Sequence, residues 1–279
     1  MERKVKTKIR GFRATDGAGV NLVRVLGNQT TKEFDPILML DSFDSTNPAD
    51  YTAGFPTHPH RGIETISYVS KGKMVHRDSL GNEDGISDGE VQWMNSGSGI
   101  MHEEMVPAAD RLLGVQLWLN LPAKDKMSKP SYNSIKSSDI KEIKIDGGKI
   151  RLLAGKYGDF QGYKGEHLPL DYYDIHLNAN AQITLNMKQD DSVMIFTLLG
   201  DIYINGKCIE EKTAVKLTEG DTVTIKNGDK NAQILYINSK ALNEPIAWAG
   251  PIVMNTQEEL EKAFRELRNN TFIKEKIKY

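Results

Sequence analysis

The 279-residue sequence contains a single cysteine, Cys208, and only six histidines. One thiol excludes an intrachain disulfide, which fits a reducing compartment, and we expect Cys208 to be incidental rather than catalytic. No stretch approaches the roughly 18 apolar residues that a membrane span needs. The first residues, MERKVKTKIRGF, lack the apolar core of a signal peptide. These absences predict a cytoplasmic protein without a membrane partner.

The chain also lacks an excess of charge of either sign. It has 36 basic and 38 acidic residues, for a net charge of -2. That balance gives no general attraction to nucleic acid, so direct nucleic-acid binding is not expected. The length suits two domains of ordinary size, and 39% hydrophobic residues are enough to build their cores.

Short strand-like runs, separated by Gly, Asn and Asp turns, make up most of the sequence and predict an all-β sandwich or barrel. The runs are 64–70, 73–79, 112–121, 171–177, 182–187, 192–199, 201–205, 222–227 and 232–238. One helix is expected near the end, where Thr256 and Glu259 form a capping box. Leu260, Ala263, Phe264 and Leu267 then give it an apolar stripe.

The two halves resemble repeats, with the polar segment 122–139 as the expected linker between them. SYVSKGKMVHRDS and DGEVQWMNSG are similar to TLLGDIYINGK and EGDTVTIKNG. Aligning the glycines places Asn186 and Lys188 at the positions of His58 and His60, and Gln233 at the position of His102. If both halves share one fold, only the first half can hold a metal ion.

His58, His60, His102 and Glu104 carry the strongest indication of function. They lie in FPTHPHRG and GIMHEEM, and both pairs have an i, i+2 spacing. Side chains at i and i+2 of a strand point to the same face, so two strands can present four ligands to one point. Three imidazoles and a carboxylate suit Fe, Mn, Ni, Cu or Zn. An octahedral ion held this way keeps two positions open.

These motifs resemble the cupin β-barrels, and in particular the pirin family. The matching stretches are DGAGVNLVRVLG, DPILMLDSF, GFPTHPHRGIETISYVSKG, GEVQWMNSGSGIMHEEM, LLGVQLWLNLPAKDKM and GPIVMNTQEELEKAF. The resemblance implies a bicupin of two jelly-roll domains with a C-terminal helix. We place the metal-binding cupin domain at 1–125 and a second cupin domain, without metal and ending in the helix, at 140–279.

The resemblance also implies one mononuclear iron, with Fe(II) as the first expectation, bound by His58, His60, His102 and Glu104. The implied activity is that of a quercetin 2,3-dioxygenase, which opens a flavonol with dioxygen and releases carbon monoxide and a depside. Glu104 would be the catalytic base for the flavonol hydroxyl. The alternative is a non-enzymatic, iron-dependent redox sensor that binds a protein partner.

The cupin pattern commonly uses a glutamate four residues after the second histidine, which is Glu64 here. Pirins use the later glutamate, so we expect Glu104 as the ligand and Glu64 as a partner that orients an imidazole. Arg61 is expected to pack. The alternative for Arg61 is that it pairs with an acid or steers an anionic substrate. His76, His167 and His176 are expected to be structural histidines.

Four apolar residues near these motifs, Trp93, Met94, Trp118 and Leu119, are predicted to lie in the barrel core. One or two of them could instead line a substrate cavity.

Overall fold

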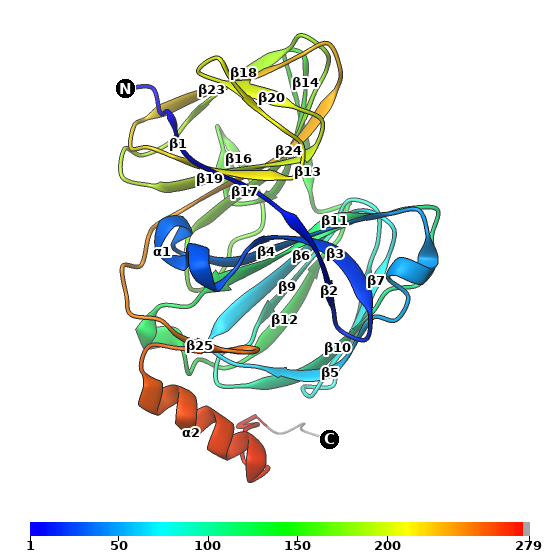
Figure 1. Ribbon diagram of the computed structural model, residues 1–279, viewed down its shortest axis with the longest axis vertical. Coiled ribbons are helices and arrows are strands. Elements are labelled where there is room, and N and C mark those ends of the chain that lie inside the picture. The colour runs from blue at the N-terminus through cyan, green and yellow to red at the C-terminus, as the bar shows by residue number, and fades with distance from the viewer. Residues whose placement is uncertain (276–279) are drawn as a thin grey trace. The chain divides into compact units, whose positions relative to one another are not determined.

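Each half of the chain folds into a β-barrel in the computed structural model, which describes residues 1–275 (Figure 1). We call Arg13–Leu22, Ile37–Ser137 and the chain from Leu242 onward the N-terminal barrel. Met1–Phe12, Val23–Pro36 and Ser138–Ala241 form the C-terminal barrel. The predicted all-β architecture of two jelly-roll domains with a C-terminal helix is confirmed.

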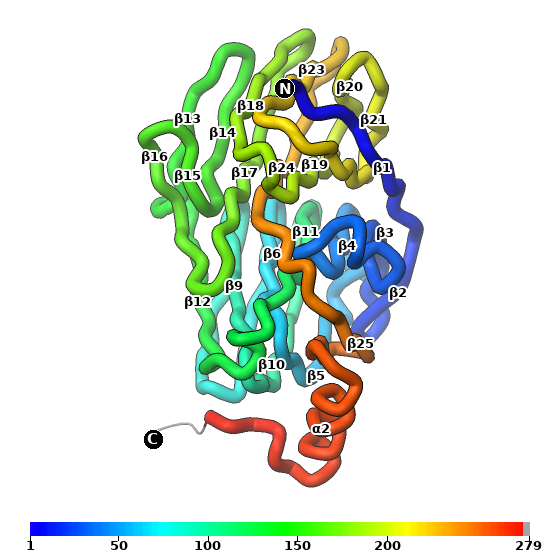
Figure 2. The backbone as a smooth tube through the Cα atoms, turned by 90° about the vertical axis from the view of Figure 1, so that its left-hand side faces the viewer, coloured from blue at the N-terminus to red at the C-terminus, as the bar shows by residue number. Residues whose placement is uncertain are grey.

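The N-terminal barrel consists of a seven-stranded and a four-stranded antiparallel sheet. The larger sheet has the order β12 (Ser131–Ile135), β9 (Glu90–Asn95), β6 (Ile63–Lys71), β11 (Leu112–Asn120), β4 (Ile37–Ser45), β3 (Val20–Leu26) and β2 (Phe12–Asp16). The smaller sheet has the order β5 (Phe55–His60), β10 (Ile100–Met105), β7 (Met74–Asp78) and β8 (Glu83–Ile86). In Figure 2 the strands from β12 to β4 can be followed side by side.

The C-terminal barrel repeats this arrangement. Its larger sheet has the order β1 (Val5–Arg10), β22 (Thr213–Leu217), β19 (Ser192–Leu199), β24 (Ala232–Ser239), β17 (Leu170–Leu177), β14 (Gly148–Ala154) and β13 (Lys141–Ile145). Its smaller sheet has the order β18 (Gln182–Asn186), β23 (Thr222–Asn227), β20 (Ile202–Ile204) and β21 (Lys207–Ile209). The matching strand orders support the predicted duplication.

One detail of the predicted alignment is wrong. Gln233 lies on β24, which has the place of β11 in the strand order, whereas His102 lies on β10, whose counterpart is β23. Apart from Asn227, the buried residues on the smaller C-terminal sheet are aliphatic, including Ile183, Leu185 and Val223. In the C-terminal barrel, aliphatic side chains therefore occupy the region where the N-terminal barrel has histidines.

The two compact units differ from the predicted domain ranges, 1–125 and 140–279, at both ends of the chain. The first strand, β1, pairs with β22 and so belongs to the C-terminal barrel. The last segment returns to the N-terminal barrel, where Ile252 bridges to Arg61. It contains the hairpin of β25 (Ala247–Ala249) and β26 (Ile252–Met254), and then helix α2 (Gln257–Arg268). We call residues 247–273 the C-terminal strap.

The helix prediction is confirmed, but the linker prediction is wrong. Helix α2 begins after Thr256, whose side chain accepts from the Glu259 amide in a capping box. Within 122–139, β12 pairs with β9 and extends the larger sheet of the N-terminal barrel. Tyr132 of this strand stacks on a buried histidine, and Ile135 is itself buried.

The remaining elements are short. They are the 3-10 helices η1 (Asn28–Thr30), η2 (Pro48–Asp50) and η3 (Ala123–Asp125), the single-turn helix α1 (Thr31–Phe34), and the two-residue strands β15 (Lys156–Tyr157) and β16 (Phe160–Gln161).

Close backbone contacts fix the C-terminal strap to the strand that carries the first histidines. Gly62 has φ +79°, and a Cβ there would lie 2.0 Å from the Val253 carbonyl oxygen. Glycine is therefore the residue that permits this approach. The buried Lys126 ammonium donates to the carbonyl oxygens of Gly62 at 2.8 Å and Val253 at 3.1 Å, and to Asn120 Oδ1. One lysine thus joins the strap to the barrel.

We predict that Lys126→Met destabilises the N-terminal barrel by about 1–3 kcal/mol, because it leaves buried acceptors without a donor. Urea unfolding followed by tryptophan fluorescence measures this, since Trp93, Trp118 and Trp248 all lie in that barrel. Lys124→Met, at an exposed position of η3, is the control.

The stability difference should also depend on pH. Burial lowers the pKa of Lys126 from 10.5 to about 7. The unfolded chain then binds more protons than the folded one between pH 7 and 10.5, so the unaltered protein gains stability relative to Lys126→Met as pH rises through that range. An unchanged unfolding curve for Lys126→Met would contradict both expectations.

Candidate metal centre

Three neighbouring strands of the smaller N-terminal sheet each present a pair of polar side chains to the barrel interior. In the register, His58 of β5 lies opposite His102 of β10, and His102 lies opposite Asp78 of β7. Glu104 lies opposite His76. Residues directly opposite each other on antiparallel strands share a face, so the register gathers these side chains.

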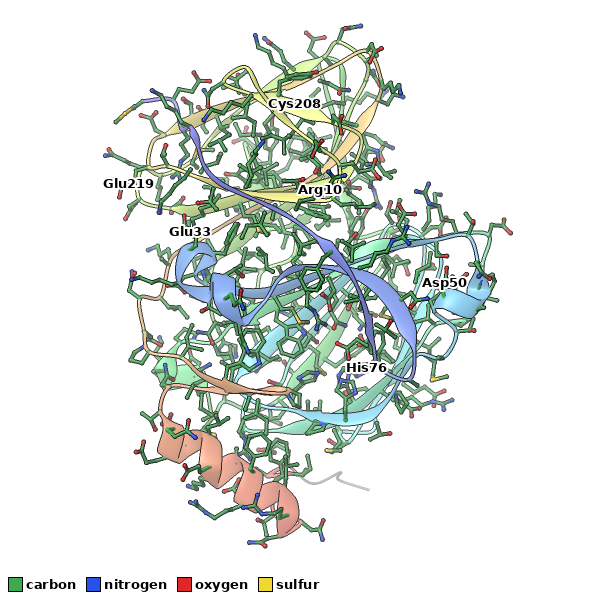
Figure 3. All side chains as sticks on the ribbon, in the orientation of Figure 1. Arg10, Glu33, Asp50, His76, Cys208 and Glu219 are labelled. Carbon is green, nitrogen blue, oxygen red and sulfur yellow. The ribbon has the colours of Figure 1, made fainter. Side chains whose placement is uncertain are left out.

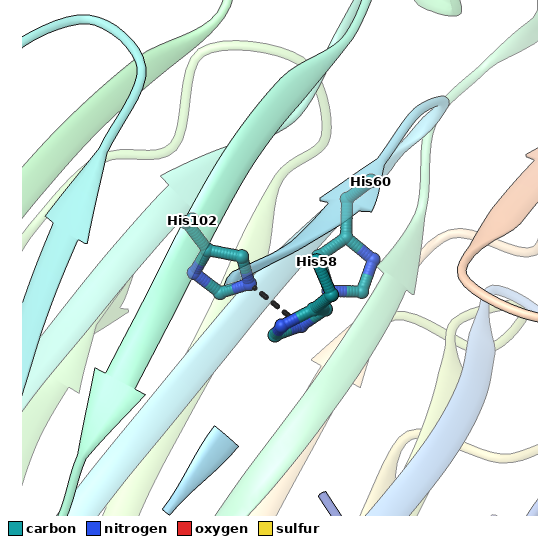
Figure 4. A group of neighbouring side chains, drawn as sticks. All are labelled: His58, His60 and His102. Carbon is teal, nitrogen blue, oxygen red and sulfur yellow. Dashed lines mark hydrogen bonds between the residues drawn. The ribbon is translucent and has the colours of Figure 1, made fainter. Parts of the chain in front are cut away.

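The imidazoles of His58, His60 and His102 converge through one nitrogen each (Figure 4). The Nε2 atom of His58 lies 3.0 Å from Nε2 of His60 and 3.0 Å from Nε2 of His102. His60 and His102 are buried, and His58 is half-buried. Within residues 1–275, these three side chains are the one group of His, Cys, Asp and Glu residues placed to share a metal ion.

In His58 and His60, a hydrogen-bond acceptor at Nδ1 determines which ring nitrogen is available to bind a metal. Nδ1 of His58 lies 2.8 Å from the Pro56 carbonyl oxygen, and Nδ1 of His60 lies 3.0 Å from that of Pro251. A carbonyl oxygen only accepts, so each Nδ1 carries the proton and each Nε2 has a lone pair. The carbonyl of Pro251 comes from the C-terminal strap.

Burial keeps two of the imidazoles neutral. Desolvation, followed by repulsion from His58, lowers the pKa of His60 to about 3, and the contact with Pro251 only partly opposes it. Desolvation also lowers the pKa of His102 well below its ordinary value, helped by the neighbouring histidines. Near neutral pH both rings are therefore unprotonated at one nitrogen, which is the state that binds metals.

The spacing of the nitrogens fits a transition-metal ion. Two ligands at about 2.1 Å from a metal lie about 3.0 Å apart when they subtend 90°, and about 3.4 Å apart at the tetrahedral angle. The two Nε2 separations of 3.0 Å match the first case. Two of the three nitrogen pairs therefore have the spacing of neighbouring ligands on one ion, and the third pair, on His60 and His102, lies within 4.8 Å.

Glu104 is buried close by, but its carboxylate is not among the converging atoms. Oε2 accepts from Gln116 Nε2 at 2.8 Å, and Oε1 accepts from Gln92 Nε2 and from Ser67 Oγ at 3.4 Å. Glu103, of opposite parity, faces outward and contacts Thr57 and Arg77. The inward direction of Glu104 agrees with the parity argument, while its role as a ligand stays a prediction.

The two other residues near the histidine pair have different surroundings. Glu64 is buried on β6, opposite Asn95 and Leu119, and its predicted contact with an imidazole stays a prediction. Arg61 packs as expected and also pairs with an acid, which was the alternative. It is 2% exposed, pairs with Glu266 at 2.8 Å, and lies 4.2 Å above the Phe272 ring. It therefore anchors α2 next to the metal-site strand.

His76 is a predicted structural histidine with one unexpected contact. It is fully buried and hydrogen-bonded inside the N-terminal barrel, as expected of a structural histidine (Figure 3). The contact that the prediction missed is the one with His102. Nδ1 of His76 lies 3.4 Å from Nδ1 of His102, and Nε2 lies 2.8 Å from Asp78 Oδ2. His76 and Asp78 have the same i, i+2 spacing as the candidate ligand motifs. That spacing could have indicated that this pair also faces the barrel interior.

The remaining predicted residues lie where expected. Trp93, Met94 and Leu119 are buried, and the ring of Trp118 meets that of His60 edge to face at 5.0 Å. Cys208 is exposed on the C-terminal barrel. His167 and His176 lie there too, and His176 contacts Asp174 at 2.8 Å.

Comparisons with known proteins agree with this architecture. Residues 19–119 match the Pirin family and residues 172–273 match the Pirin C-terminal cupin domain. The chain is 37% identical to a pirin-like protein of Caulobacter vibrioides, over 97% of this chain and 99% of that one. It is 34% identical to human pirin, over 96% and 93% of the two chains.

A crystal structure of quercetin 2,3-dioxygenase from Acinetobacter baumannii has a TM-score of 0.90 and 30% identity, covering 98% of this chain and 99% of that one. The protein belongs to the pirin family of bicupins. Within residues 1–275, no helix is long and apolar enough to cross a membrane.

We predict that the purified protein binds about one transition-metal ion per chain, because one barrel has the histidine cluster and the other has an aliphatic interior. His58→Ala should lower the metal affinity by more than the roughly 10–100-fold that loss of an outer hydrogen bond costs. His167→Ala, on the C-terminal barrel, should leave it unchanged. Elemental analysis that gives two ions per chain, or none after reconstitution with Fe(II), would contradict the prediction.

Proposed function

We propose that the protein is a metal-dependent dioxygenase that opens flavonols such as quercetin with dioxygen. One observation carries the proposal: Nε2 of His58 lies 3.0 Å from Nε2 of both His60 and His102, and His102 is two residues along its strand from the buried carboxylate of Glu104. The likeness to the quercetin 2,3-dioxygenase of Acinetobacter baumannii supports the choice of substrate.

His58, His60 and His102 would hold the ion through Nε2, with Glu104 as a fourth ligand. We propose iron first, as Fe(II), with Mn, Ni, Cu and Zn as alternatives. When bound, the ion would supply open positions for substrate and dioxygen and would lower the pKa of a hydroxyl group that binds to it.

Glu104 would take the proton of the flavonol hydroxyl. Its carboxylate is the acidic group that β10 turns into the barrel beside His102, and the amides of Gln92 and Gln116 hold it in place. Two amide donors fix the direction of both oxygens, which a general base needs in order to reach its proton.

Aromatic and aliphatic side chains surround the site on the side of His60. Trp118 contacts the His60 ring at 5.0 Å, and Trp248 of the C-terminal strap lies 5.7 Å from Trp118. Leu38, Met39 and Ile63 pack into the same apolar cluster. Such a wall would hold a flavonol through its rings and exclude water from the reaction.

The alternative function is an iron-dependent regulatory protein whose oxidation state changes a surface for a protein partner. Both functions need the same metal ligands, so metal content does not separate them. Turnover does: protein that holds Fe(II) and opens no flavonol would favour the regulatory function.

We predict that the Fe(II)-loaded protein reacts with quercetin in air, bleaching its long-wavelength absorbance and releasing carbon monoxide. A matched flavone without the 3-hydroxyl should not react, because it lacks the group that becomes an anionic ligand. Equal rates for the two compounds would rule out coordination through that hydroxyl. Absorbance, oxygen consumption and carbon monoxide release should be measured together.

Three glutamine substitutions should separate the nearby glutamates. Glu104→Gln should weaken metal binding or abolish turnover, because it removes the charge of a ligand and base. Glu64→Gln should keep the metal and lower activity by roughly 10–100-fold, as expected of a residue that orients a ligand. Glu103→Gln, on the outward face of the same strand, is the control. A metal-bound structure with Glu64 on the ion and Glu104 turned away would reverse the assignment.

A further inference from the structure

His58 and His60 have backbone acceptors at Nδ1, whereas His102 has a side chain there. The carbonyl oxygens of Pro56 and Pro251 accept from Nδ1 of His58 and His60, respectively. At His102 the neighbour is Nδ1 of His76, at 3.4 Å, and a ring nitrogen either donates or accepts according to its tautomer. The free nitrogen of His102 is therefore decided by the protonation of His76, and that depends on what lies beyond it.

Asp78 lies beyond His76 and acts only as an acceptor. Its Oδ1 accepts from the backbone amides of Leu80 at 2.8 Å and Asn82 at 3.1 Å. Its Oδ2 accepts from Asn82 Nδ2 at 2.9 Å. Both oxygens are thus directed at N–H donors, as in a carboxylate. The 2.8 Å contact between Oδ2 and Nε2 of His76 is then a hydrogen bond that His76 donates.

For the neutral form of the His76 ring, this bond determines the positions of the remaining protons. A neutral His76 with its proton on Nε2 has a lone pair on Nδ1. That lone pair accepts from Nδ1–H of His102. The lone pair of His102 is then on Nε2, the atom that lies 3.0 Å from Nε2 of His58.

We propose that His76 and Asp78 form a positioning pair that fixes the tautomer of His102 and so presents its Nε2 lone pair to the metal. All three histidines then have one feature in common, an acceptor at Nδ1. The pair acts through His102 and does not touch the metal. The inference concerns the same site as the proposed function, but it needs metal binding and not flavonol turnover.

Packing holds the ring of His76 in the plane that this arrangement requires. Tyr132 of β12 stacks on it, with ring centroids 4.0 Å apart and an angle of 11° between the planes. The C-terminal barrel provides a comparison, because His176 contacts Asp174 at 2.8 Å there, away from any metal cluster in the described chain. Loss of that pair should not affect metal binding.

Two substitutions at His76 separate the hydrogen bond from the packing. His76→Phe keeps an aromatic ring against Tyr132 but removes both nitrogens. His76→Asn loses the ring but places an amide oxygen near the position of Nδ1, where it can accept from His102. We expect His76→Phe to lower the affinity for Co(II) by roughly 10–100-fold, and His76→Asn to retain most of it.

Asp78→Asn should invert the tautomer of His102. The amides of Leu80 and Asn82 require an oxygen at the Oδ1 position, so the amide nitrogen of the substituted side chain would face His76 and donate to Nε2. His76 would then carry its proton on Nδ1, and His102 would carry its proton on Nε2, toward the metal. We expect a loss of Co(II) affinity comparable with that of His76→Phe.

Chelator competition and the Co(II) absorption spectrum measure binding, with His176→Phe as the matched control. Long-range ¹H–¹⁵N NMR of the histidine rings in metal-free full-length protein reads the tautomers directly. We expect the His102 proton on Nδ1 in the unaltered protein and on Nε2 in Asp78→Asn. Tryptophan fluorescence checks folding, and if Asp78→Asn does not fold, the two His76 variants decide.

Three results would overturn the proposal. They are unchanged affinity in His76→Phe, affinity in His76→Asn as low as in His76→Phe, or a proton on Nε2 of His102 in the unaltered protein. Failure to open any flavonol would count against the proposed function alone, because it leaves these affinities and tautomers unchanged.

Discussion

The candidate metal centre depends on the register of three antiparallel strands, β5, β10 and β7. Because His58 lies opposite His102, and His102 lies opposite Asp78, the inward residues of the three strands are neighbours inside the barrel. A shift of one residue in the register would turn the inward side chains of a strand to the opposite face of the sheet. This pairing therefore positions the three candidate ligand histidines. It also positions the carboxylate of Glu104 and the outer pair of His76 and Asp78.

The C-terminal barrel shows that the fold does not require the metal. It repeats the strand order of the N-terminal barrel, yet its smaller sheet turns buried residues such as Ile183, Leu185 and Ile225 inward. Each fully buried aliphatic side chain contributes about 1.5–3 kcal/mol. The N-terminal barrel gives up part of that contribution to hold imidazoles and amides inside, as expected of a functional site in a shared fold.

The C-terminal strap connects distant sequence to the metal site. Pro251 provides the acceptor for His60, Gly62 allows the approach of Val253, and Arg61 anchors Glu266 and Phe272. A metal site assembled from residues near 60 and near 102 thus also needs residues near 251. The orientation of a ligand ring is decided by a segment about 190 residues further along the chain.

The sequence by itself determined the all-β class, the C-terminal helix and the candidate ligands, because strand alternation, capping and i, i+2 spacing are local patterns. It did not determine that β12 completes a sheet or that β1 pairs with β22, because pairing across long separations leaves little local trace. The i, i+2 rule placed Glu104 inward but could not show that Gln92 and Gln116 hold it. Only the tertiary structure set His76 against His102, because that contact requires the register of β7 on β10.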